Sequence, residues 1–334
     1  MSGPFIAVDS VSRRFDPRVS LGDRIAGALG GVVDKRPVRA VDSVSLAVAR
    51  GEVLGLVGES GCGKSTLARM IAGILPPTSG AIRIGGEPVM SAGRHPRKRT
   101  TRVQMVFQDP YASLDPRMRV QEIVAEGPII HRLVARSEAA AYVSDWLGKV
   151  GLDPDAARRY PHQFSGGQRQ RIAIARALAM KPEALVCDEP VASLDVSIQA
   201  QVLNLLLDLQ RELALTVLFI SHHLGVVRHV SDRIAIMHLG RIVEIGTAAA
   251  VYETPQHPYT QALLASVPTL VLEDDAVVSF QPIQGELPSP MSPPPGCHFH
   301  LRCPLAGSRC RSESPALRRT GPHQSAACHL VPEA

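Results

Sequence analysis

Residues 58–65 read Gly58-Glu59-Ser60-Gly61-Cys62-Gly63-Lys64-Ser65, and they match the phosphate-binding pattern G-x-x-x-x-G-K-[ST] at every fixed position. The apolar residues 53–57 come directly before and indicate a buried strand. Apolar residues then recur at three- and four-residue spacing from Leu67 to Leu75 and indicate a helix, which Pro76 ends. A strand, a glycine-rich loop and a helix in this order are the context that the pattern requires. The stretch therefore predicts a nucleoside triphosphate site.

Each part of this stretch has a chemical role in holding a triphosphate. Glycines let backbone N–H groups point inward as an anion nest, and the start of the helix adds positive dipole. We expect Lys64 to reach the β and γ phosphates and Ser65 to ligate Mg²⁺. The alternative is a glycine turn that binds nothing, which the complete pattern in its proper context disfavours. The predicted ATP-binding residues here are Gly58, Glu59, Ser60, Gly61, Cys62, Gly63, Lys64, Ser65 and Thr66.

Length and composition limit what the chain can be. Its 334 residues suffice for one large α/β domain with an appendage, or for two modest domains. No apolar run reaches the ~18 residues needed to span a bilayer, and no basic-then-apolar segment opens the chain, so we expect a cytosolic protein. A net charge of +5 is a weak argument for nucleic acid. Residues 94–99 are basic but lack interleaved aromatic residues, so we interpret them as a solvated loop and expect no nucleic-acid partner.

Strand-like and helix-like patterns alternate along the first three quarters or so of the chain, which is typical of the α/β class. Short apolar runs at 184–187 and 216–220 are typical of strands buried in a parallel sheet. Helical periodicity dominates from residue 120 to about 159, where Trp146 lies on the apolar stripe and is expected in the core. The glycine-rich residues 16–39 are predicted to form an irregular insertion.

Two adjacent carboxylates follow the apolar run at 184–187. A P-loop needs an acidic residue at a strand end to hold Mg²⁺, and Asp188 supplies one. Glu189 is next to it, and two buried neighbouring carboxylates repel each other unless a cation lies nearby. We therefore assign Asp188 to Mg²⁺ and Glu189 to polarising the attacking water. The alternative is a solvated strand end with no catalytic role.

A second anion-binding segment is predicted at Ser165-Gly166-Gly167-Gln168, which opens a helix expected from Gln168 to Met180. The Ser165 hydroxyl and the glycine N–H groups then stand at a helix N-terminus, which favours negative charge. One chain therefore carries two phosphate-binding segments. If both cannot close on one ATP within a chain, a head-to-tail dimer would let each ATP lie between them.

These motifs together closely resemble the nucleotide-binding subunits of ABC transporters. The resemblance covers roughly residues 5–260 and implies an ABC-type P-loop NTPase domain at 1–260 with an inserted helical subdomain at about 111–175. It also implies a small Cys-rich C-terminal extension at 261–334. The motifs occur in the family's order, and they are Gly58 to Ser65, Gln108, Ser165 to Gln168, Asp188-Glu189, Ser193-Leu194-Asp195 and His222.

The resemblance also implies a role for each motif residue. Gln108 couples Mg²⁺ and the attacking water to the membrane domain, and His222 senses the γ-phosphate, so both join Glu189 as catalytic residues. Ser165, Gly166, Gly167 and Gln168 bind the γ-phosphate of the partner's ATP, and Asp195 lies at the dimer seam. Phe15 is the candidate for stacking on adenine.

The sequence departs from the family's usual pattern at two positions. Phe164 stands where most ABC proteins have leucine, and His223 stands where an aspartate is common. Neither change removes a chemical group that we assigned. His223 leaves open which of the two adjacent histidines faces the nucleotide.

Further stretches resemble the ATPases of oligopeptide and dipeptide importers, namely residues 108–117, 257–260 and 285–290. The segment that starts at Phe164 is similar to the second, F-type paralogue of the two ATPases in such importers. The resemblance implies an ATP-hydrolysing motor subunit, peripheral on the cytoplasmic face of the membrane. Its implied partners are a paralogous ATPase in a heterodimer, two permease subunits and an extracytoplasmic peptide-binding protein.

Four cysteines follow a proline-rich spacer, and in a reducing cytosol they suggest a metal before a disulfide. The first interval is longer than a zinc knuckle uses, so zinc is one alternative and unligated thiols are another. Mixed Cys and His ligation stays open because histidines flank the cysteines. Resemblance to family members with this cysteine pattern implies a [4Fe–4S] cluster, for which four thiolates are the ligand set. The cysteines are Cys297, Cys303, Cys310 and Cys328.

Other functions share parts of this pattern. A nickel or sugar importer would use a similar motor, because cargo selectivity lies in the permease and the binding protein. A DNA-associated ABC ATPase is disfavoured by the single cassette, the absence of a coiled-coil insertion and the mild charge. A regulatory subunit that does not hydrolyse ATP is disfavoured because Lys64, Asp188, Glu189 and His222 are all present.

Overall fold

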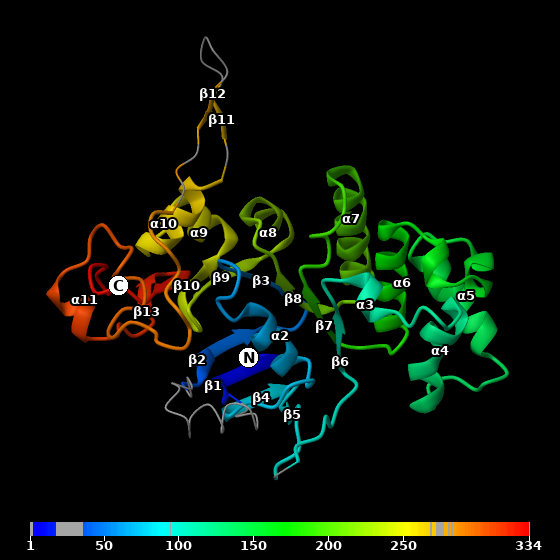
Figure 1. Ribbon diagram of the computed structural model, residues 1–334. Helices are drawn as coiled ribbons and strands as arrows, with labels where there is room; N and C mark the ends of the chain where they lie inside the picture. Colours follow the sequence, from blue (N-terminus) through cyan, green and yellow to red (C-terminus); the bar gives the residue numbers. More distant parts are fainter. Residues whose placement is uncertain are drawn as a thin grey trace, which may run out of the picture.

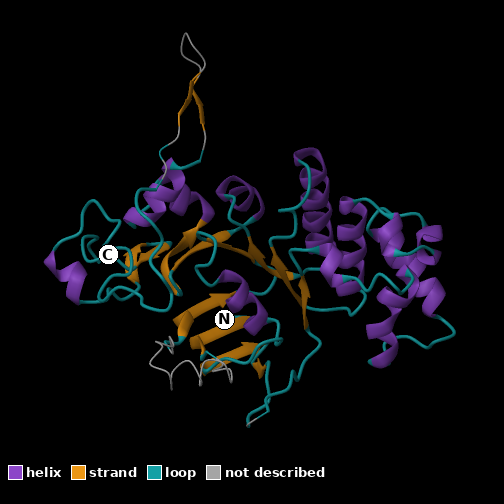
Figure 2. Cartoon of the chain, viewed as in Figure 1, coloured by secondary structure: helices purple, strands orange, loops and turns teal. Residues whose placement is uncertain are grey.

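The computed structural model of the protein describes residues 3–17, 36–93, 95–267, 269–271, 277–279, 281 and 283–333. Strands and helices alternate through most of this range, which confirms the α/β class (Figures 1 and 2). The insertion predicted at residues 16–39 falls outside the described residues except at its two ends. Within the described part of the chain, no helix combines the length and the apolar character needed to cross a bilayer.

The larger sheet carries the strands that lead into the site. Its strands are β3 (Val53–Val57), β6 (Val103–Val106), β7 (Ala184–Asp188), β8 (Thr216–Ile220), β9 (Arg233–His238), β10 (Arg241–Thr247), β13 (Arg318–Gly321) and β14 (Gln324–Ala326). The strand order is β13-β14-β10-β9-β3-β8-β7-β6, and β9, β3, β8, β7 and β6 run parallel. Every residue of β3, β7 and β8 is buried. Continuous apolar runs form these strands because both faces of the sheet are covered.

A smaller antiparallel sheet lies against one face of the larger one (Figure 2). It has the order β2-β1-β4-β5 and contains β1 (Ile6–Phe15), β2 (Val38–Val48), β4 (Ser79–Ile84) and β5 (Glu87–Pro88). The helix α2 (Lys64–Ile71) follows the glycine loop and buries Leu67 and Met70 completely. Both side chains share one apolar core with Val8 of the small sheet and Leu54 of the large sheet. The helix therefore joins the two sheets.

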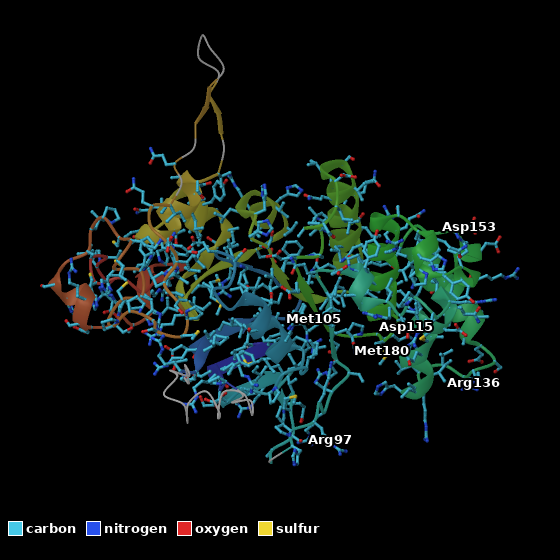
Figure 3. The ribbon with its side chains drawn as sticks, in the orientation of Figure 1. Arg97, Met105, Asp115, Arg136, Asp153 and Met180 are labelled. Carbon is cyan, nitrogen blue, oxygen red and sulfur yellow. The ribbon has the colours of Figure 1, made fainter. Side chains whose placement is uncertain are left out.

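A group of helices lies between β6 and β7 in sequence and forms the end of the molecule opposite the C-terminus (Figure 1). They are α3 (Pro110–Ser113), α4 (Val120–Ile130), α5 (Ala139–Lys149) and α6 (Gly166–Leu178), with 3-10 turns at Pro154–Arg158 and Pro161–Gln163. In Figure 3, Arg136 and Asp153 lie in the outer part of this group, and Met105 and Met180 lie where it meets the sheets. Trp146 of α5 is 4% exposed, which confirms its predicted place in the core.

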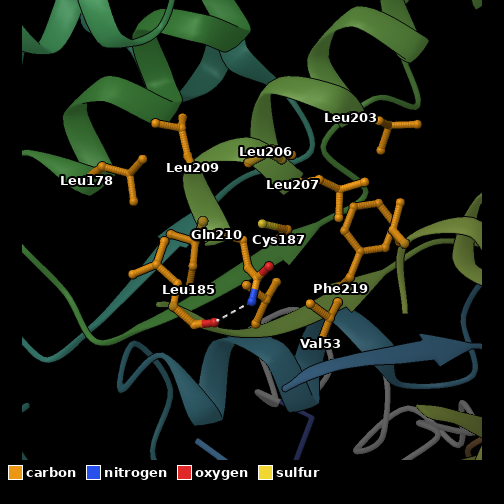
Figure 4. Close-up of a pocket in the computed structure, with 13 residues that line it drawn as sticks. Val53, Leu178, Leu185, Cys187, Leu203, Leu206, Leu207, Leu209, Gln210 and Phe219 are labelled. Atoms are coloured by element: carbon orange, nitrogen blue, oxygen red, sulfur yellow. Dashed lines mark hydrogen bonds between the residues drawn. The ribbon is translucent and has the colours of Figure 1, made fainter. Parts of the chain in front are cut away.

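The other face of the larger sheet is covered by α7 (Val196–Glu212), α8 (Leu224–Val230), α9 (Ala248–Glu253) and α10 (Pro258–Ala265). An apolar cavity remains beneath α7, and Figure 4 shows leucines of that helix facing Cys187 and Phe219 of the sheet. Gln210 lies at its edge and donates a hydrogen bond to the Leu215 carbonyl at 3.2 Å. Burial raises the pKa of the Cys187 thiol to about 12, so this cysteine stays neutral.

The C-terminal segment continues the larger sheet. It contains β11 (Thr269–Val271), β12 (Val277–Ser279), α11 (Ser308–Ser312), β13 and β14. Glu244 of β10 pairs with Ala326 of β14 in antiparallel register. The buried Gln324 side chain donates from Nε2 to Glu244 Oε1 at 2.6 Å. The sheet thus runs across the sequence division that we predicted at residue 260.

An aromatic cluster joins the end of β9 to this C-terminal segment. The His238 ring is fully buried, with its centroid 4.4 Å from that of Tyr259 and 5.4 Å from that of Phe299. Neither ring nitrogen of His238 has a hydrogen-bond partner among the described residues. Burial lowers the pKa of His238 to about 3, although the Glu59 carboxylate, 3.9 Å from Nδ1, opposes this shift. The neutral ring is therefore part of the core.

Replacing His238 by phenylalanine should make the protein less sensitive to acid. The unfolded chain binds this proton near pH 6.5, whereas the folded chain resists it until the pKa of about 3. His238 therefore contributes stability that is fully present above pH 6.5 and falls as the pH drops. The loss at pH 5 is about 2 kcal/mol. The difference in Tm between pH 7.5 and pH 5 should be smaller for His238→Phe than for the wild type.

The matched control for this prediction is His131→Asn, which changes an exposed histidine at the end of α4. It should keep the wild-type difference in Tm between the two pH values. If His238→Phe also keeps that difference, burial of the neutral ring does not set the acid sensitivity.

Candidate functional site

The glycine loop between β3 and α2 needs glycine at two positions for steric reasons. Gly63 has φ +111°, and a Cβ there would lie 2.1 Å from the Ala40 carbonyl oxygen. A Cβ on Gly58 would lie 2.1 Å from the Met237 carbonyl oxygen. The loop therefore packs directly against backbone of β2 and β9, and side chains at these positions would displace it. This close packing fixes the curve of the loop.

Lys64 points back into the curve of this loop. Its side chain is almost fully buried, and Nζ donates to the carbonyl oxygens of Gly58 at 2.7 Å and of Glu59 at 3.0 Å. The ammonium group is therefore held at the centre of the loop by backbone groups. A cation in this position, with backbone N–H groups around it, favours a bound phosphate group.

Ser65 and Asp188 form the second part of the site. The Ser65 hydroxyl donates to Asp188 Oδ1 at 3.0 Å, so the first turn of α2 touches the end of β7. Burial raises the pKa of the Asp188 carboxyl, and the adjacent charge of Glu189 raises it further. A hydroxyl beside a buried carboxylate is a ligand pair that suits Mg²⁺, whose charge would compensate the buried carboxylate.

Glu189 lies next to two of the other predicted catalytic residues. Its carboxylate Oε2 accepts a hydrogen bond from Gln108 Nε2 at 3.0 Å and lies 3.2 Å from His222 Nδ1. The backbone of Glu189 has φ +47°, a left-handed conformation that is uncommon outside glycine. Such strain concentrates at functional sites. Three elements that are distant in sequence therefore meet at one carboxylate.

The two adjacent histidines point in different directions. His222 faces Glu189 with a side chain that is 54% exposed. His223 is the N-cap of α8, where its Nδ1 accepts a hydrogen bond from the Val226 N–H at 3.4 Å. The side chain of His223 is thus occupied by the backbone of the helix, and His222 is the histidine at the site.

Most of these groups line one open pocket, and Asp188 and His222 contact its lining residues Ser65 and Glu189. Phe15 lies at its edge, 37% exposed, with the Arg13 guanidinium 4.7 Å from its ring centroid. Pro290 of the C-terminal segment also lines it and accepts a hydrogen bond from the Arg39 N–H at 3.1 Å. The lining residues are Phe15, Val38, Ala40, Ser60, Gly61, Gly63, Lys64, Ser65, Thr66, Gln108, Glu189 and Pro290.

The predicted second anion segment is not part of this pocket. Ser165 caps α6, where its hydroxyl accepts from the Gln168 N–H at 3.3 Å, and both side chains are exposed. None of residues 165–168 lines the described pocket around Lys64, and Asp195 is likewise exposed at the start of α7. The structure therefore brings the P-loop, Asp188, Glu189, Gln108 and His222 together and leaves Ser165 and Gln168 exposed outside the pocket.

The four tail cysteines surround one small cavity. All four thiols are free, and they line this cavity with His257, His300 and His329. Burial raises the pKa of Cys297 to about 11. In the part of the chain that the structure describes, no three Cys, His, Asp or Glu side chains form a group that could hold a metal ion. The predicted cluster is therefore not confirmed.

Two residues of this site were missed by the sequence analysis. Arg302 donates from both terminal nitrogens to the two carboxylate oxygens of Glu59, each at 2.8 Å. Tyr259 accepts from the Glu59 N–H at 3.0 Å. Tyr259 lies in the stretch 257–260, which indicates the subfamily but gives no sign of a contact with the loop, and no local pattern marks Arg302, because it contacts the loop across 243 positions.

Comparison with known proteins agrees with this geometry. Residues 41–192 match the family described as ABC transporter, and residues 243–310 match the family described as oligopeptide/dipeptide transporter, C-terminal region. The structure is similar to that of cbiO1 from Clostridium perfringens, part of the ABC transporter complex cbiONQ, with a TM-score of 0.59 and 26% identity. That match covers 75% of this chain and 92% of cbiO1. The fold and the site thus define an ABC-type P-loop ATPase.

Named relatives show which kind of ABC ATPase this chain resembles. The chain is 52% identical to the di/tripeptide transport ATP-binding protein DppF of Pseudomonas aeruginosa over 87% of its length and 90% of that protein. It is 48% identical to the oligopeptide transport ATP-binding protein AppF of Bacillus subtilis over 88% and 90% of the two chains. The protein belongs to the family of ATP-binding proteins of peptide ABC transporters.

Substitution of the two histidines by alanine should have unequal effects on ATP turnover. His222→Ala removes the ring that faces Glu189, and we expect kcat to fall by about 10²-fold or more, which is the usual contribution of such a group. His223→Ala removes only a helix cap, so kcat should stay within about threefold while Tm falls slightly. Phosphate-release assays on the assembled transporter measure both, and equal losses of kcat would contradict the assignment.

Proposed function

We propose that this protein is the ATP-hydrolysing motor subunit of an importer for dipeptides or oligopeptides. One observation carries the proposal: Glu189 is held beside Gln108 and His222, and it lines the same pocket as Lys64 of the P-loop. This is the arrangement that ATP hydrolysis needs, because a base must face the γ-phosphate. The peptide cargo is inferred from the named relatives.

The residues divide the chemistry between them. Lys64 and the loop N–H groups bind the β and γ phosphates of ATP, and Phe15 stacks on the adenine. Ser65, Asp188 and, through its amide oxygen, Gln108 would hold Mg²⁺, which neutralises charge on the phosphates when bound. Glu189 orients the attacking water and takes its proton, and His222 contacts the γ-phosphate. These assignments are supported because Phe15, Lys64, Ser65, Gln108 and Glu189 line one pocket, while Asp188 and His222 contact Ser65 and Glu189.

We infer further that ATP lies between two ATPase subunits. In this chain the P-loop is half of a site, because residues 165–168 do not line the pocket and the Ser165 and Gln168 side chains are exposed. A partner in head-to-tail arrangement would place its own copy of that segment over the γ-phosphate, and Asp195 would lie at the seam. The resemblance to the F-type paralogue favours a heterodimer with the other paralogous ATPase over a homodimer.

The permease would dock on the cleft beside Gln108. A groove between β6, α4 and α6 is lined by apolar and charged residues, including Ile74, Phe107 and Met180. Ile74 is 50% exposed, and Ile130 at the end of α4 is 66% exposed. An amphipathic helix of a permease subunit would cover these side chains. The protein would then be peripheral on the cytoplasmic face of the membrane, with a peptide-binding protein on the opposite side.

The tail cysteines would hold a [4Fe–4S] cluster. Their common cavity supports this proposal, because four free thiols line it and four thiolates are the ligand set of such a cluster. A single zinc ion would need its ligands about 2.3 Å from one point. A four-iron cluster holds its ligands further apart, which suits a group that lines a cavity without converging on one point. The cluster would supply a rigid crosslink within the extension.

Glu189→Gln should bind ATP as the wild type does but lose turnover by at least about 10³-fold, because the base is absent while the phosphate contacts remain. ATP should then accumulate between closed subunits. Native mass spectrometry of the transporter purified through a tag on this chain should show the second ATPase, two permease subunits and two ATP molecules.

Glu212→Gln at the end of α7 is the control, because Glu212 is exposed and lies outside the pocket. It should retain wild-type turnover. Full hydrolysis by Glu189→Gln would rule out Glu189 as the base. Recovery of the chain with no permease subunit, together with ATPase activity stimulated by duplex DNA, would contradict the role in import.

Protein purified without oxygen should contain about four iron atoms and four acid-labile sulfides per chain if the cysteines hold a cluster. Cys310→Ser should lose this iron, whereas Cys187→Ala, which changes a cysteine beneath α7, should keep it. Metal analysis by mass spectrometry measures both. About one zinc atom per chain would favour the zinc alternative, and absence of both metals would contradict any metal site.

A further inference from the structure

Arg302 connects the C-terminal extension to the phosphate-binding loop. Its side chain is 4% exposed, and its guanidinium makes a bidentate pair with the Glu59 carboxylate at 2.8 Å for each bond. A third bond runs from Nε to the Gln284 carbonyl at 3.2 Å. Bidentate Arg–carboxylate pairs fix both distance and orientation. The loop is therefore braced by a residue beside Cys303 in the sequence.

Glu59 is held by the protein at more than its carboxylate. The Tyr259 hydroxyl accepts a hydrogen bond from the Glu59 N–H at 3.0 Å, and the Tyr259 ring is fully buried. The centroid of the Phe299 ring lies 5.2 Å from that of Tyr259. Phe299 and Arg302 belong to the same short segment of the extension, so one rigid cluster contacts both the backbone and the side chain of Glu59.

The carbonyl of Glu59 leads directly to the ATP site. It accepts a hydrogen bond from Lys64 Nζ at 3.0 Å, next to the bond that Gly58 accepts at 2.7 Å. Movement of Glu59 would therefore displace a carbonyl oxygen that holds Lys64, the residue that we assign to binding the phosphates. Arg302 does not line the pocket itself. Its effect on ATP has to pass through Glu59.

The Arg302–Glu59 pair also affects the charge of the loop. A carboxylate in a loop that binds a triphosphate repels the ligand, and Glu59 is partly buried with a side chain that is 25% exposed. Burial raises the pKa of this carboxyl, but the Arg302 guanidinium outweighs burial and holds the pKa below its usual range. The other titratable groups near Glu59 are Lys64, whose ammonium bonds the Glu59 carbonyl, and His238, Tyr259 and Cys62, which burial keeps neutral. The Arg302 guanidinium thus compensates the charge of a carboxylate that belongs to the loop.

We propose that Arg302 is a positioning residue of the ATP site, through which the C-terminal extension sets the conformation and charge of the P-loop by way of Glu59. The inference rests on the proposed ATP site and adds a residue outside the known nucleotide motifs. It assigns the extension a direct influence on nucleotide affinity.

Arg302→Met should weaken binding of the non-hydrolysable analogue AMP-PNP to the full-length protein by about 2- to 30-fold, the range for residues that act on a site without touching the ligand. In the Glu59→Gln background the same substitution should change affinity by less than about twofold, because the partner through which it acts is gone. In turnover assays on the assembled transporter, KM for ATP should rise while kcat stays within about twofold.

Two variants control for general damage to the extension. Arg309→Met breaks the Arg309–Glu313 pair of α11, which has bonds of 2.7 and 2.9 Å on the exposed surface, and should leave AMP-PNP affinity unchanged. Arg302→Lys keeps the charge but cannot form the two-bond fork. It should weaken AMP-PNP binding less than Arg302→Met does. If Arg302→Met does not fold, Arg302→Lys is combined with Glu59→Gln in its place.

The outcomes separate this inference from the proposed function. If the wild type and Arg302→Met bind AMP-PNP equally while Lys64→Ala does not bind, the ATP site stands and the role of Arg302 is wrong. If Arg302→Met has the same effect with and without Glu59→Gln, Arg302 acts on folding or by distant charge, and the inference is also wrong. If the folded wild type does not bind AMP-PNP, the ATP site is wrong and the inference falls with it.

Discussion

The register of the parallel strands is the constraint on which the site depends. Ile220 of β8 pairs with Leu56 of β3 on one side and with Asp188 of β7 on the other, so the carboxyl ends of these strands lie in one row. The pairing of Val106 with Cys187 extends the row to β6. The segment after each strand end therefore meets the others at one edge of the sheet, where α/β proteins bind ligands. A slip of one residue would turn Asp188 to the opposite face.

At this edge of the sheet, the sequence predicts those functional residues that come directly after a buried strand. The strand at 216–220 was predicted and found with the same bounds, and the apolar run that ends at Cys187 correctly marked the strand before the paired carboxylates. Such segments are readable because burial on both faces demands a continuous apolar run. The strand β1, from Ile6 to Phe15, is harder to read from the sequence, because it is irregular and its exposed residues interrupt the apolar pattern.

Contacts between distant segments could not be predicted because no local pattern records them. The sequence left open which of His222 and His223 faces the nucleotide. The choice is made by the start of α8, where the backbone uses His223 as its N-cap and turns it away from Glu189. Likewise, the tail cysteines could be grouped by composition, but their common cavity depends on β14 pairing with β10. Tertiary structure decides both cases.

The two sides of the nucleotide pocket differ in how firmly they are held. The P-loop side is fixed within the chain, by backbone contacts at Gly58 and Gly63 and by the aromatic cluster and Arg302 at Glu59. The side that carries Glu189 is more open to solvent, since the neighbouring His222 side chain is 54% exposed, and Glu189 itself holds a left-handed backbone conformation there. A rigid half and an open half suit a site that a second subunit completes, because binding energy then closes the interface without being spent on ordering the loop. The extension thus belongs to the rigid half of the site.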